Sequence, residues 1–214
     1  MTPLYADDAL VAFDKPAGLL TIPGRRAGEP TLKEEGEKAL GRPLWTVHRL
    51  DRETSGLVIF ALGPEAHRAL SMAFERREVE KRYVALVHPA PARDEARLEG
   101  PLAPARRGFM RPARPGEKGA IAVTSFRVLR RLAGGRALLE VRPETGRTHQ
   151  IRLQLAEAGS PIVGEPHYRS SAGVRALPGP RLFLHAAALS LRHPATRARL
   201  SLEAPLPAGF EGQL

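Results

Sequence analysis

Short apolar runs, each bounded by turn-forming residues, predict β-strands along the chain. Residues 10–13 form one such run, which ends at a Pro- and Gly-containing turn over residues 14–18. Residues 57–62 are continuously apolar, as in a strand that is buried on both faces, and residues 83–87 form a third run that Pro89 stops. Further short runs predict strands over residues 121–128, 137–141, 182–185, 188–191 and 199–203.

Three segments between these runs have helical spacing. Thr31 and Glu34 form the pattern of a capping box, which predicts a helix that continues through residue 40. Residues 64–77 place alanine and leucine side chains on one face of a second helix. Residues 148–158 predict a third helix, which Gly159 closes.

The order of these elements predicts an α+β fold with a mixed, mostly antiparallel sheet flanked by helices. Gly134 and Gly135 lie between two of the runs and predict a hairpin there. Residues 89–118 are rich in Pro, Gly and Arg, which predicts loops with one or two edge strands. Without an internal repeat or an obvious linker, the 214 residues predict a single domain over residues 1–214.

Positive charge is concentrated in one part of the chain. The sequence has 33 Lys and Arg against 23 Asp and Glu, a net charge of +10. Residues 101–152 hold 12 of the cations and only 3 of the acids, so most of the excess lies there. This concentration predicts a basic surface for a polyanion such as nucleic acid, and the alternative is a solvated arginine-rich surface without a partner.

Composition also excludes several kinds of chemistry. The chain has no cysteine, which excludes disulfides, thiolate nucleophiles and cysteine-bound zinc. The seven histidines have no metal-ligand spacing, and no glycine-rich phosphate loop is present, so we expect neither a metal nor a nucleotide cofactor. No apolar run approaches the roughly 20 residues of a membrane span, and the N-terminus has no signal-peptide pattern. A cytoplasmic protein without a membrane partner is the expectation.

A polar segment over residues 48–56 is the first candidate for chemistry. Asp51 lies between Arg49 and Arg52 in this segment, which ends at Gly56 just before the apolar run. Nearby cations favour the ionised carboxylate, which can act as a nucleophile or a base. The alternative is an aspartate that caps a turn and pairs with arginine at the surface.

A second candidate covers residues 144–152, between a predicted strand and a predicted helix. Gly146 permits a tight turn there, and the start of the helix offers free N–H groups to an anion. Arg147 at this junction could pair with a carboxylate or a phosphate. His149 could be a base or a hydrogen-bonded structural histidine.

Six segments, in order, resemble the motifs of RluA-type RNA pseudouridine synthases. Residues 48–57 read H-R-L-D-R-E-T-S-G-L and residues 146–152 read G-R-T-H-Q-I-R, and both resemble signatures of that family. Shorter matches, D-K-P-A-G, K-R-Y-V-A, P-I-V-G and L-H-A, lie at residues 14–18, 81–85, 161–164 and 184–186. The matches follow the family order and extend over nearly the whole chain.

The resemblance implies an isomerase that converts uridine in rRNA or tRNA to pseudouridine after flipping the target base out of its stack. It also implies the pseudouridine synthase fold, with a catalytic cleft across the middle of the sheet. The reaction needs no cofactor, RNA is the partner, and a monomer is expected. Asp51 corresponds to the essential carboxylate, and whether it acts as nucleophile or base stays open.

The resemblance assigns roles to six other residues. Tyr83 stacks on the uracil and helps to remove the C5 proton, and Arg147 pairs with the aspartate, which completes the catalytic set. Among the substrate-binding residues, Arg49 displaces the target nucleotide and Ile151 lines the base pocket. The remaining two substrate-binding residues are Thr54 and Arg152, of which Arg152 either touches phosphate or braces its loop. Candidate backbone contacts, equally explained as a solvated loop, are Arg106, Arg107, Arg111 and Arg114.

The sequence departs from the family pattern at two positions and leaves two other functions open. Gln154 stands where many relatives have histidine, and Glu165 stands where aspartate is usual. The chain has no room for the small S4-type domain of many relatives, so the catalytic domain is expected to select its substrate.

One alternative function is that of a non-catalytic RNA-binding protein with the same fold. The other is a glycosidase-like hydrolase, which needs a second acid near Asp51, and Glu53 is the nearest in sequence.

Overall fold

The computed structural model describes residues 1–24 and 28–211, with the side chains of Arg107 and Glu211 excepted. The chain forms two compact units, and each takes its residues from two stretches of sequence. The first unit comprises Met1–Lys81 and His185–Leu206, and the second comprises Arg82–Leu184 together with the C-terminal residues from Pro207. No single linker separates the units, and the single domain expected from the sequence stays a prediction.

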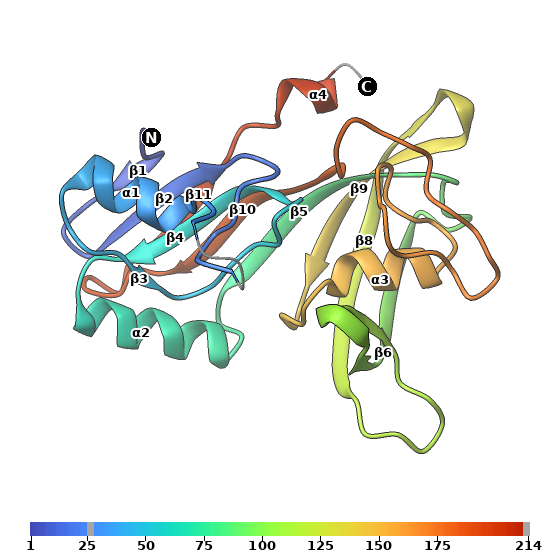
Figure 1. Ribbon diagram of the computed structural model, residues 1–214, viewed down its shortest axis with the longest axis horizontal. Helices are drawn as coiled ribbons and strands as arrows, with labels where there is room; N and C mark the ends of the chain where they lie inside the picture. Colours follow the sequence, from blue (N-terminus) through green and yellow to red (C-terminus); the bar gives the residue numbers. More distant parts are fainter. Residues whose placement is uncertain (25–27, 212–214) are drawn as a thin grey trace. The chain divides into compact units, whose positions relative to one another are not determined.

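The first unit is a sheet with a helix on each face (Figure 1). Its strands run in the order β1 (Tyr5–Ala6), β2 (Leu10–Lys15), β4 (Ser55–Ala61) and β10 (Leu184–Arg192); β3 (Trp45–Thr46) pairs with β4, and β11 (Arg199–Glu203) pairs with β10. The β4–β10 pair is parallel, and the other strand pairs of this unit are antiparallel. The helices are α1 (Leu32–Leu40) and α2 (Pro64–Glu75).

The continuous apolar run of β4 is explained by burial on both faces. Leu57, Ile59 and Ala61 pack with the apolar face of α2. Phe60 points to the opposite face and meets the Phe13 ring edge-on, and Phe13 lies against Gly36 of α1. Every residue of β4 is buried as a result, and the alternation typical of a half-exposed strand is absent. The capping box predicted at Thr31 and Glu34 is present at the start of α1.

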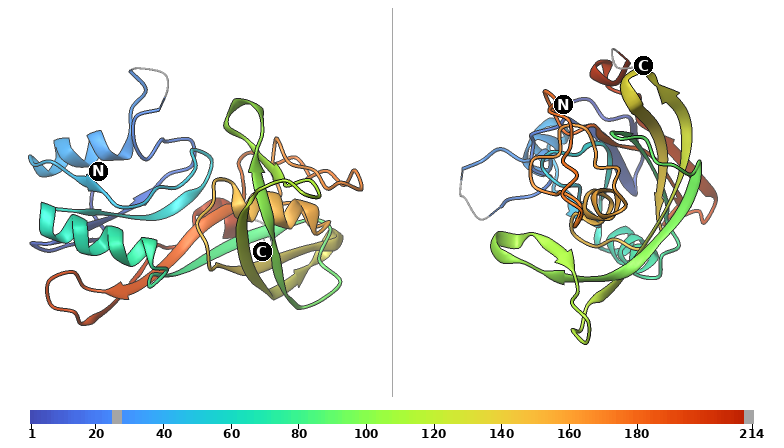
Figure 2. Two further views of the ribbon diagram at one scale, coloured as in Figure 1. Left: turned by 90° about the horizontal axis from the view of Figure 1, so that it is seen from below. Right: turned by 90° about the vertical axis from the view of Figure 1, so that its right-hand side faces the viewer.

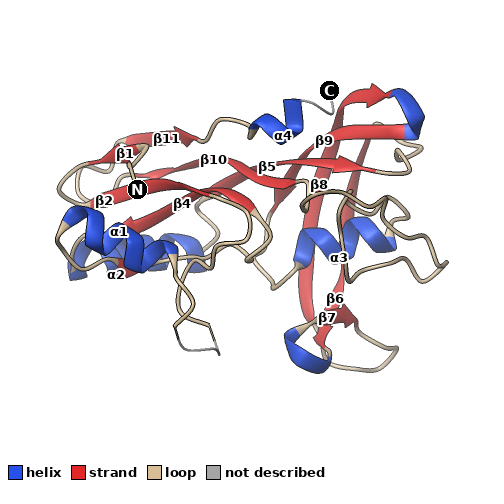
Figure 3. Ribbon diagram, turned by 45° about the horizontal axis from the view of Figure 1, so that its top comes forward, coloured by secondary structure: helices blue, strands red, loops and turns tan. Residues whose placement is uncertain are grey.

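The second unit is an antiparallel sheet with one long helix beside it (Figure 3). Its strand order is β5 (Glu80–Val87), β9 (Arg136–Pro143), β8 (Ala120–Leu132), β6 (Glu95–Pro104) and β7 (Met110–Pro112). The helix α3 (Gln150–Glu157) packs Leu153 and Ala156 against Leu102 and Ala122 of this sheet. Shorter helical segments are η1 (Arg106–Gly108), η2 (Ala133–Gly135) and α4 (Ala208–Glu211).

The predicted α+β class with a largely antiparallel sheet is confirmed, and the structure adds the short elements β1, β3 and α4, which the sequence does not predict. Residues 184–192 form one continuous strand, although the sequence predicts two short runs there. Residues 95–104 form a ten-residue strand that pairs with β8 along residues 95–102 and with β7 only at residues 102–104, so most of β6 lies at the edge of the sheet, as predicted for this stretch. No helix within the described residues is both long and apolar enough to cross a membrane.

Candidate active-site segments

The loop that carries Asp51 connects β3 to β4 and is fixed by its backbone. The Thr54 N–H donates to the Asp51 carbonyl at 3.2 Å, which closes a turn around the aspartate. The Thr21 hydroxyl donates to the Leu50 carbonyl at 3.0 Å and accepts from the Leu50 N–H at 3.1 Å. The half-buried Asp51 therefore sits in a short loop whose backbone is held by these hydrogen bonds.

A buried lysine holds the other side of this loop. The Lys15 side chain is fully buried, and its ammonium donates to the carbonyls of Pro16, Leu19 and Arg52 at 3.0, 2.7 and 3.1 Å. An ammonium has three N–H donors, and these three carbonyls match them. The Gly18 N–H also donates to the Arg52 carbonyl, at 2.8 Å. The D-K-P-A-G segment thus acts as a clamp on the aspartate loop.

The start of β4 requires the small residues that follow the aspartate. Gly56 has φ 113°, and a Cβ atom there would lie 2.3 Å from the Ala186 carbonyl oxygen of β10. Only glycine tolerates both the positive φ and this close approach. The neighbouring Ser55 hydroxyl lies 2.8 Å from Nδ1 of the fully buried His185. The parallel pairing of β4 with β10 therefore fixes one end of the aspartate loop.

His48 has a structural role in the same segment. Its Nε2 accepts the Ile59 N–H at 3.0 Å, and its ring stacks on Phe74 at 4.6 Å. Burial, with a further contribution from the charge of Lys81, lowers the pKa of His48 to about 3. Burial and nearby Arg77 likewise lower the pKa of Lys81 to about 8. His48 is thus a neutral hydrogen-bond acceptor that anchors the backbone of β4.

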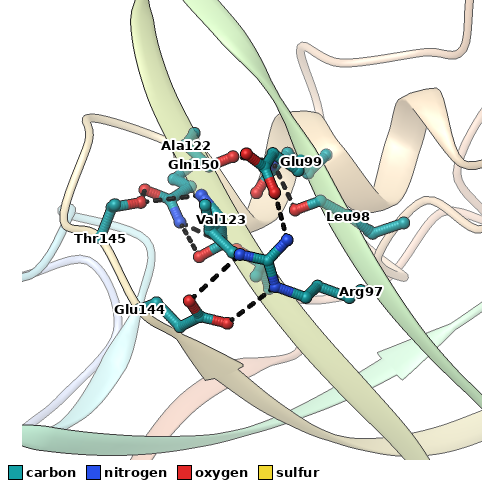
Figure 4. Close-up of polar contacts among 10 residues, drawn as sticks. Arg97, Leu98, Glu99, Ala122, Val123, Glu144, Thr145 and Gln150 are labelled. Carbon is teal, nitrogen blue, oxygen red and sulfur yellow. Dashed lines mark hydrogen bonds and ion pairs between the residues drawn. The ribbon is translucent and has the colours of Figure 1, made fainter.

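The second candidate segment is organised by the side-chain amide of Gln150, the first residue of α3 (Figure 4). Gln150 Oε1 accepts the Thr145 hydroxyl at 2.7 Å and the Arg147 N–H at 3.0 Å. Its Nε2 donates to the Val123 carbonyl and the Thr124 hydroxyl oxygen, both at 2.9 Å. These four hydrogen bonds fold the loop before α3 tightly onto β8.

Arg147 projects from this fixed loop. Its side chain is exposed, and its Nε lies 3.5 Å from the Ile121 carbonyl, at the limit of a hydrogen bond. Glu144, at the start of the loop, forms an ion pair with Arg97 of β6, which also pairs with Glu99 (Figure 4). Glu144, the acid nearest to Arg147 in sequence, is therefore already paired with Arg97.

Arg152 lies inside the second unit. Its side chain is 1% exposed, and its Nε and Nη2 donate to the two carboxylate oxygens of Glu165 at 2.6 and 3.0 Å. The guanidinium also lies over the Tyr168 ring, 5.7 Å from its centroid. The sequence leaves two roles open for Arg152, a phosphate contact or a brace, and this geometry is that of a brace.

The predicted site residues divide between the two units. Arg49, Asp51 and Thr54 lie in the loop before β4, where Arg49 is exposed and Thr54 is buried. Tyr83 and the α3 segment belong to the second unit. Tyr83 is a half-buried residue of β5 opposite Val141. Arg147 lies in the loop before α3, and the buried Ile151 and Arg152 lie in its first turn.

The arginines around η1 that are candidates for contacts with the RNA backbone differ in their surroundings. Arg111 forms a bidentate ion pair with Glu117, with both N···O distances 2.7 Å, and this pair lowers the pKa of Glu117 to about 2. Arg106 and Arg114 are exposed, and the side chain of Arg107 lies outside the described residues. Within the described part of the chain, no group of three or more His, Asp or Glu side chains is arranged to hold a metal ion.

Three residues with clear supporting roles were not singled out from the sequence. Lys15 and Gln150 lie inside recognisable motifs, but nothing in their residue types indicates that one clamps the aspartate loop and the other organises the Arg147 loop. Tyr168 is a third: its hydroxyl accepts the Met110 N–H at 3.1 Å and lies 2.7 Å from His149 Nδ1. His149 itself has φ 52°, so the turn before α3 is held in the left-handed region by this contact.

Comparison with known proteins identifies relatives over most of the chain. A family profile described as RNA pseudouridylate synthase matches residues 9–157. The dual-specificity RNA pseudouridine synthases RluA of Escherichia coli K12 and Pasteurella multocida are each 37% identical to this chain, over 94% of it and 91% of their own length. The human RNA Pseudouridylate Synthase Domain Containing 4 superposes with a TM-score of 0.80 at 27% identity, covering 99% of this chain and 90% of its own. The human RNA Pseudouridylate Synthase Domain Containing 1, at 23% identity and a TM-score of 0.79 over 95% and 82% of the two chains, shares the fold.

Proposed function

The chain belongs to the RNA pseudouridylate synthase family, isomerases that convert uridine to pseudouridine in RNA, and we propose that Asp51 is its essential carboxylate and that rRNA and tRNA stem-loops are its substrates. The observation that carries this proposal is the geometry of the Asp51 loop. Hydrogen bonds of the loop backbone to Thr21, Gly18 and Lys15 fix the loop, and Asp51 is half-buried rather than enclosed in the core. A carboxylate on a fixed loop outside the core is the arrangement that covalent or base catalysis needs.

The proposed reaction conserves all atoms of the nucleotide. The bond from C1′ to N1 breaks, the uracil rotates, and a bond forms from C1′ to C5. The proton leaves C5, and N1 gains one. No electrons are exchanged with another molecule, so the chemistry of the chain's own side chains is sufficient for the step.

Each remaining site residue has a role in the proposal. Tyr83 stacks on the extruded uracil and assists removal of the C5 proton, and Ile151 forms an apolar wall of the base pocket. Arg147 orients the Asp51 carboxylate, which agrees with its exposure on a loop that Gln150 holds. Arg49 occupies the space that the displaced nucleotide leaves, in agreement with its exposed side chain. Thr54 supports the loop from its buried position.

Substrate choice is part of the proposal. The names of the E. coli and P. multocida relatives state dual specificity, which supports offering this chain both tRNA and rRNA. The basic stretch over residues 101–152 supplies charge for the RNA backbone. The monomeric state and the cytoplasmic location stay predictions.

A map of pseudouridine at single-nucleotide resolution tests the proposal. Wild-type protein and the Asp51→Asn variant are incubated with unmodified tRNA and rRNA transcripts, and carbodiimide-dependent reverse-transcription stops are recorded. The matched control is Asp8→Asn. Asp8 is an exposed aspartate of the same unit, and it precedes Leu10, which pairs with Ala61 at the end of β4 about 20 Å from the aspartate loop.

We expect stops with wild type and with Asp8→Asn, and none with Asp51→Asn. Stops that persist with Asp51→Asn would refute the catalytic role of this carboxylate. Binding of RNA without stops by any of the three proteins would favour the non-catalytic RNA-binding function instead.

A further inference from the structure

A second basic segment lies outside the stretch in which most of the charge is concentrated. Residues 166–181 contain three arginines, one histidine and no acid. Over the whole C-terminal third of the chain, acids elsewhere offset part of this excess of positive charge. The segment, orange in Figure 2, forms an extended loop between Glu165 and the start of β10, beside α3 in the second unit.

The base of this loop is closed by backbone contacts. The Gly164 N–H donates to the Leu177 carbonyl at 2.8 Å, and the Phe183 N–H donates to the Val163 carbonyl at 3.0 Å. Gly164 has φ 79°, and a Cβ atom there would lie 1.8 Å from the Arg181 carbonyl oxygen. The two ends of the loop therefore cross in direct contact, which only glycine permits at this position.

The tip of the loop is also held. The Ser170 N–H donates to the Val174 carbonyl at 3.0 Å, and the Val174 N–H donates to the Ser170 hydroxyl oxygen at 3.0 Å. The Ser171 hydroxyl donates to the Glu157 carboxylate of α3 at 2.5 Å. The backbone positions that carry the side chains of this loop are therefore fixed.

Two arginines face one another across the loop. Arg169 and Arg175 are partners in an isolated antiparallel bridge, so their side chains leave the same face of the backbone. Both are exposed, and among the described residues neither guanidinium has an ion pair or a hydrogen bond. Like charges directly opposite each other are destabilising. An anion between them would remove that repulsion.

The same two arginines line a hollow of about 600 Å³ together with the exposed His167. The acid in its lining, Glu165, is already engaged, because its carboxylate binds the Arg152 guanidinium and the His167 N–H. The imidazole of His167 packs against Phe109 at 4.5 Å. The hollow is therefore positively charged, and it lies in the size range of sites that hold a nucleotide.

We propose that Arg169 and Arg175 bind a phosphodiester of the substrate RNA in this hollow, a contact separate from the arginines of residues 101–152. The inference rests on the proposed function for the identity of the polyanion. Arginine suits the role because its planar fork donates two parallel hydrogen bonds to phosphate oxygens. Such a contact binds the backbone and reads no base, so it contributes affinity and position rather than sequence preference.

The test measures how RNA affinity depends on salt. Binding of unmodified tRNA and rRNA transcripts is measured from 50 to about 300 mM KCl with the Asp51→Asn variant, so that turnover does not interfere. The same measurement is made after adding Arg169→Ala with Arg175→Ala. The matched control adds Arg68→Ala with Arg76→Ala, which removes the same charge from exposed positions on and next to α2 of the other unit. Thermal melting of each protein verifies folding.

We expect the Arg169 and Arg175 pair of substitutions to weaken binding about tenfold and to make the slope of log K against log salt shallower by about 0.7–0.9, because the one phosphodiester that the two arginines bind contributes roughly that much. Replacement of the same two residues by lysine, which retains the charge, is expected to restore most of the slope. The Arg68 and Arg76 pair is expected to leave the slope as it is. An equal change in both pairs would mean that net charge alone is responsible and would overturn the proposal, as would an unchanged slope.

A second arm separates RNA from a free phosphate as the source of the anion. Inorganic phosphate and uridine monophosphate are titrated calorimetrically into wild-type protein and into the Arg169→Ala, Arg175→Ala variant. Saturable binding that disappears in the variant, with no change in RNA affinity, would assign the hollow to a free phosphate and overturn the RNA assignment. Because the affinity measurements do not depend on turnover, failure of the wild type to form pseudouridine would refute the proposed function without deciding this inference.

Discussion

The buried ammonium of Lys15 gives the sharpest test of how the aspartate loop is held. The substitution Lys15→Met keeps an unbranched side chain of similar length and removes the donors to Pro16, Leu19 and Arg52. All three carbonyls lose the Lys15 donor, and of the three the Arg52 carbonyl retains the Gly18 N–H. Pro16 is exposed and Leu19 half-buried, and water can therefore replace part of what is lost.

The expected cost follows from these three carbonyls. An unsatisfied buried carbonyl costs about 1–3 kcal/mol, and partial hydration places Pro16 and Leu19 at the lower end. Removing the buried charge recovers some of this energy, which leaves a net loss of about 2 kcal/mol in the free energy of unfolding, or roughly 30-fold in the folding equilibrium. For a chain of this size the loss lowers the melting temperature by about 4–8 °C.

Two measurements check the reasoning. Urea unfolding followed by circular dichroism gives the stability of Lys15→Met, and pseudouridine formation is assayed well below its melting temperature. We expect turnover to fall by more than the lost stability explains, because the aspartate loop loses its clamp while the sheet stays folded. Lys33→Met is the control: Lys33 forms a partly exposed i,i+4 pair with Glu37, worth no more than about 0.5 kcal/mol. Equal effects of the two substitutions, or wild-type turnover by Lys15→Met, would refute the clamp.

Four further outcomes are expected. Gly56→Ala should destabilise the protein by more than about 3 kcal/mol in urea unfolding, because its Cβ meets a backbone carbonyl that cannot move cheaply; a loss below about 1 kcal/mol would contradict the close approach. Arg152→Ala and Glu165→Gln should each cost about 3–5 kcal/mol, since each leaves a buried charge unpaired, and a phosphate-binding Arg152 would instead change RNA affinity and spare stability in the Glu165 variant. Since His48 has a pKa of about 3 in the folded state, below its ordinary 6.5, stability should be full above pH 6.5 and decline as the pH falls toward 3; the decline between pH 6.5 and 4 should be smaller in His48→Gln. Arg147→Ala should lower turnover about 100-fold or more with RNA affinity nearly retained, and normal kinetics would exclude its pairing with the carboxylate.

Local signals in the sequence predict the parts of the fold that depend on local contacts. The capping box at Thr31 and Glu34 is satisfied by residues three positions apart, and the observed helix begins where the pattern places it. The long strand β6 is different. Its residues 95–104 include Pro and Gly, and the segment is a strand because β8 supplies hydrogen bonds from residues 120–127. Pairing over that distance in sequence has no local signature.

The candidate site shows the same division. The residue types around Asp51 and Arg147 identify two segments capable of chemistry, and the ordered motifs connect them with one reaction. Whether a polar side chain faces solvent or the core is set by partners far away in sequence. The sequence leaves Arg152 either a phosphate contact or a brace, and the choice is decided by Glu165, which lies beyond the end of the helix. The Lys15 ammonium is likewise occupied by carbonyl acceptors that only the folded loop brings together.

The composition of the first unit from two stretches of chain has a consequence for how the enzyme is made. Residues 1–81 leave the ribosome first, but Gly56 and Ser55 find their β10 partners only after residues 82–184 have been synthesised. At about 5–20 residues per second this delay is on the order of 5–20 s. The nascent chain therefore carries its aspartate loop without the strand that supports it until residues 185–186 have been synthesised. A polypeptide interrupted anywhere before residue 185 would lack that support, so the ability to modify RNA would arise only after β10 has been made.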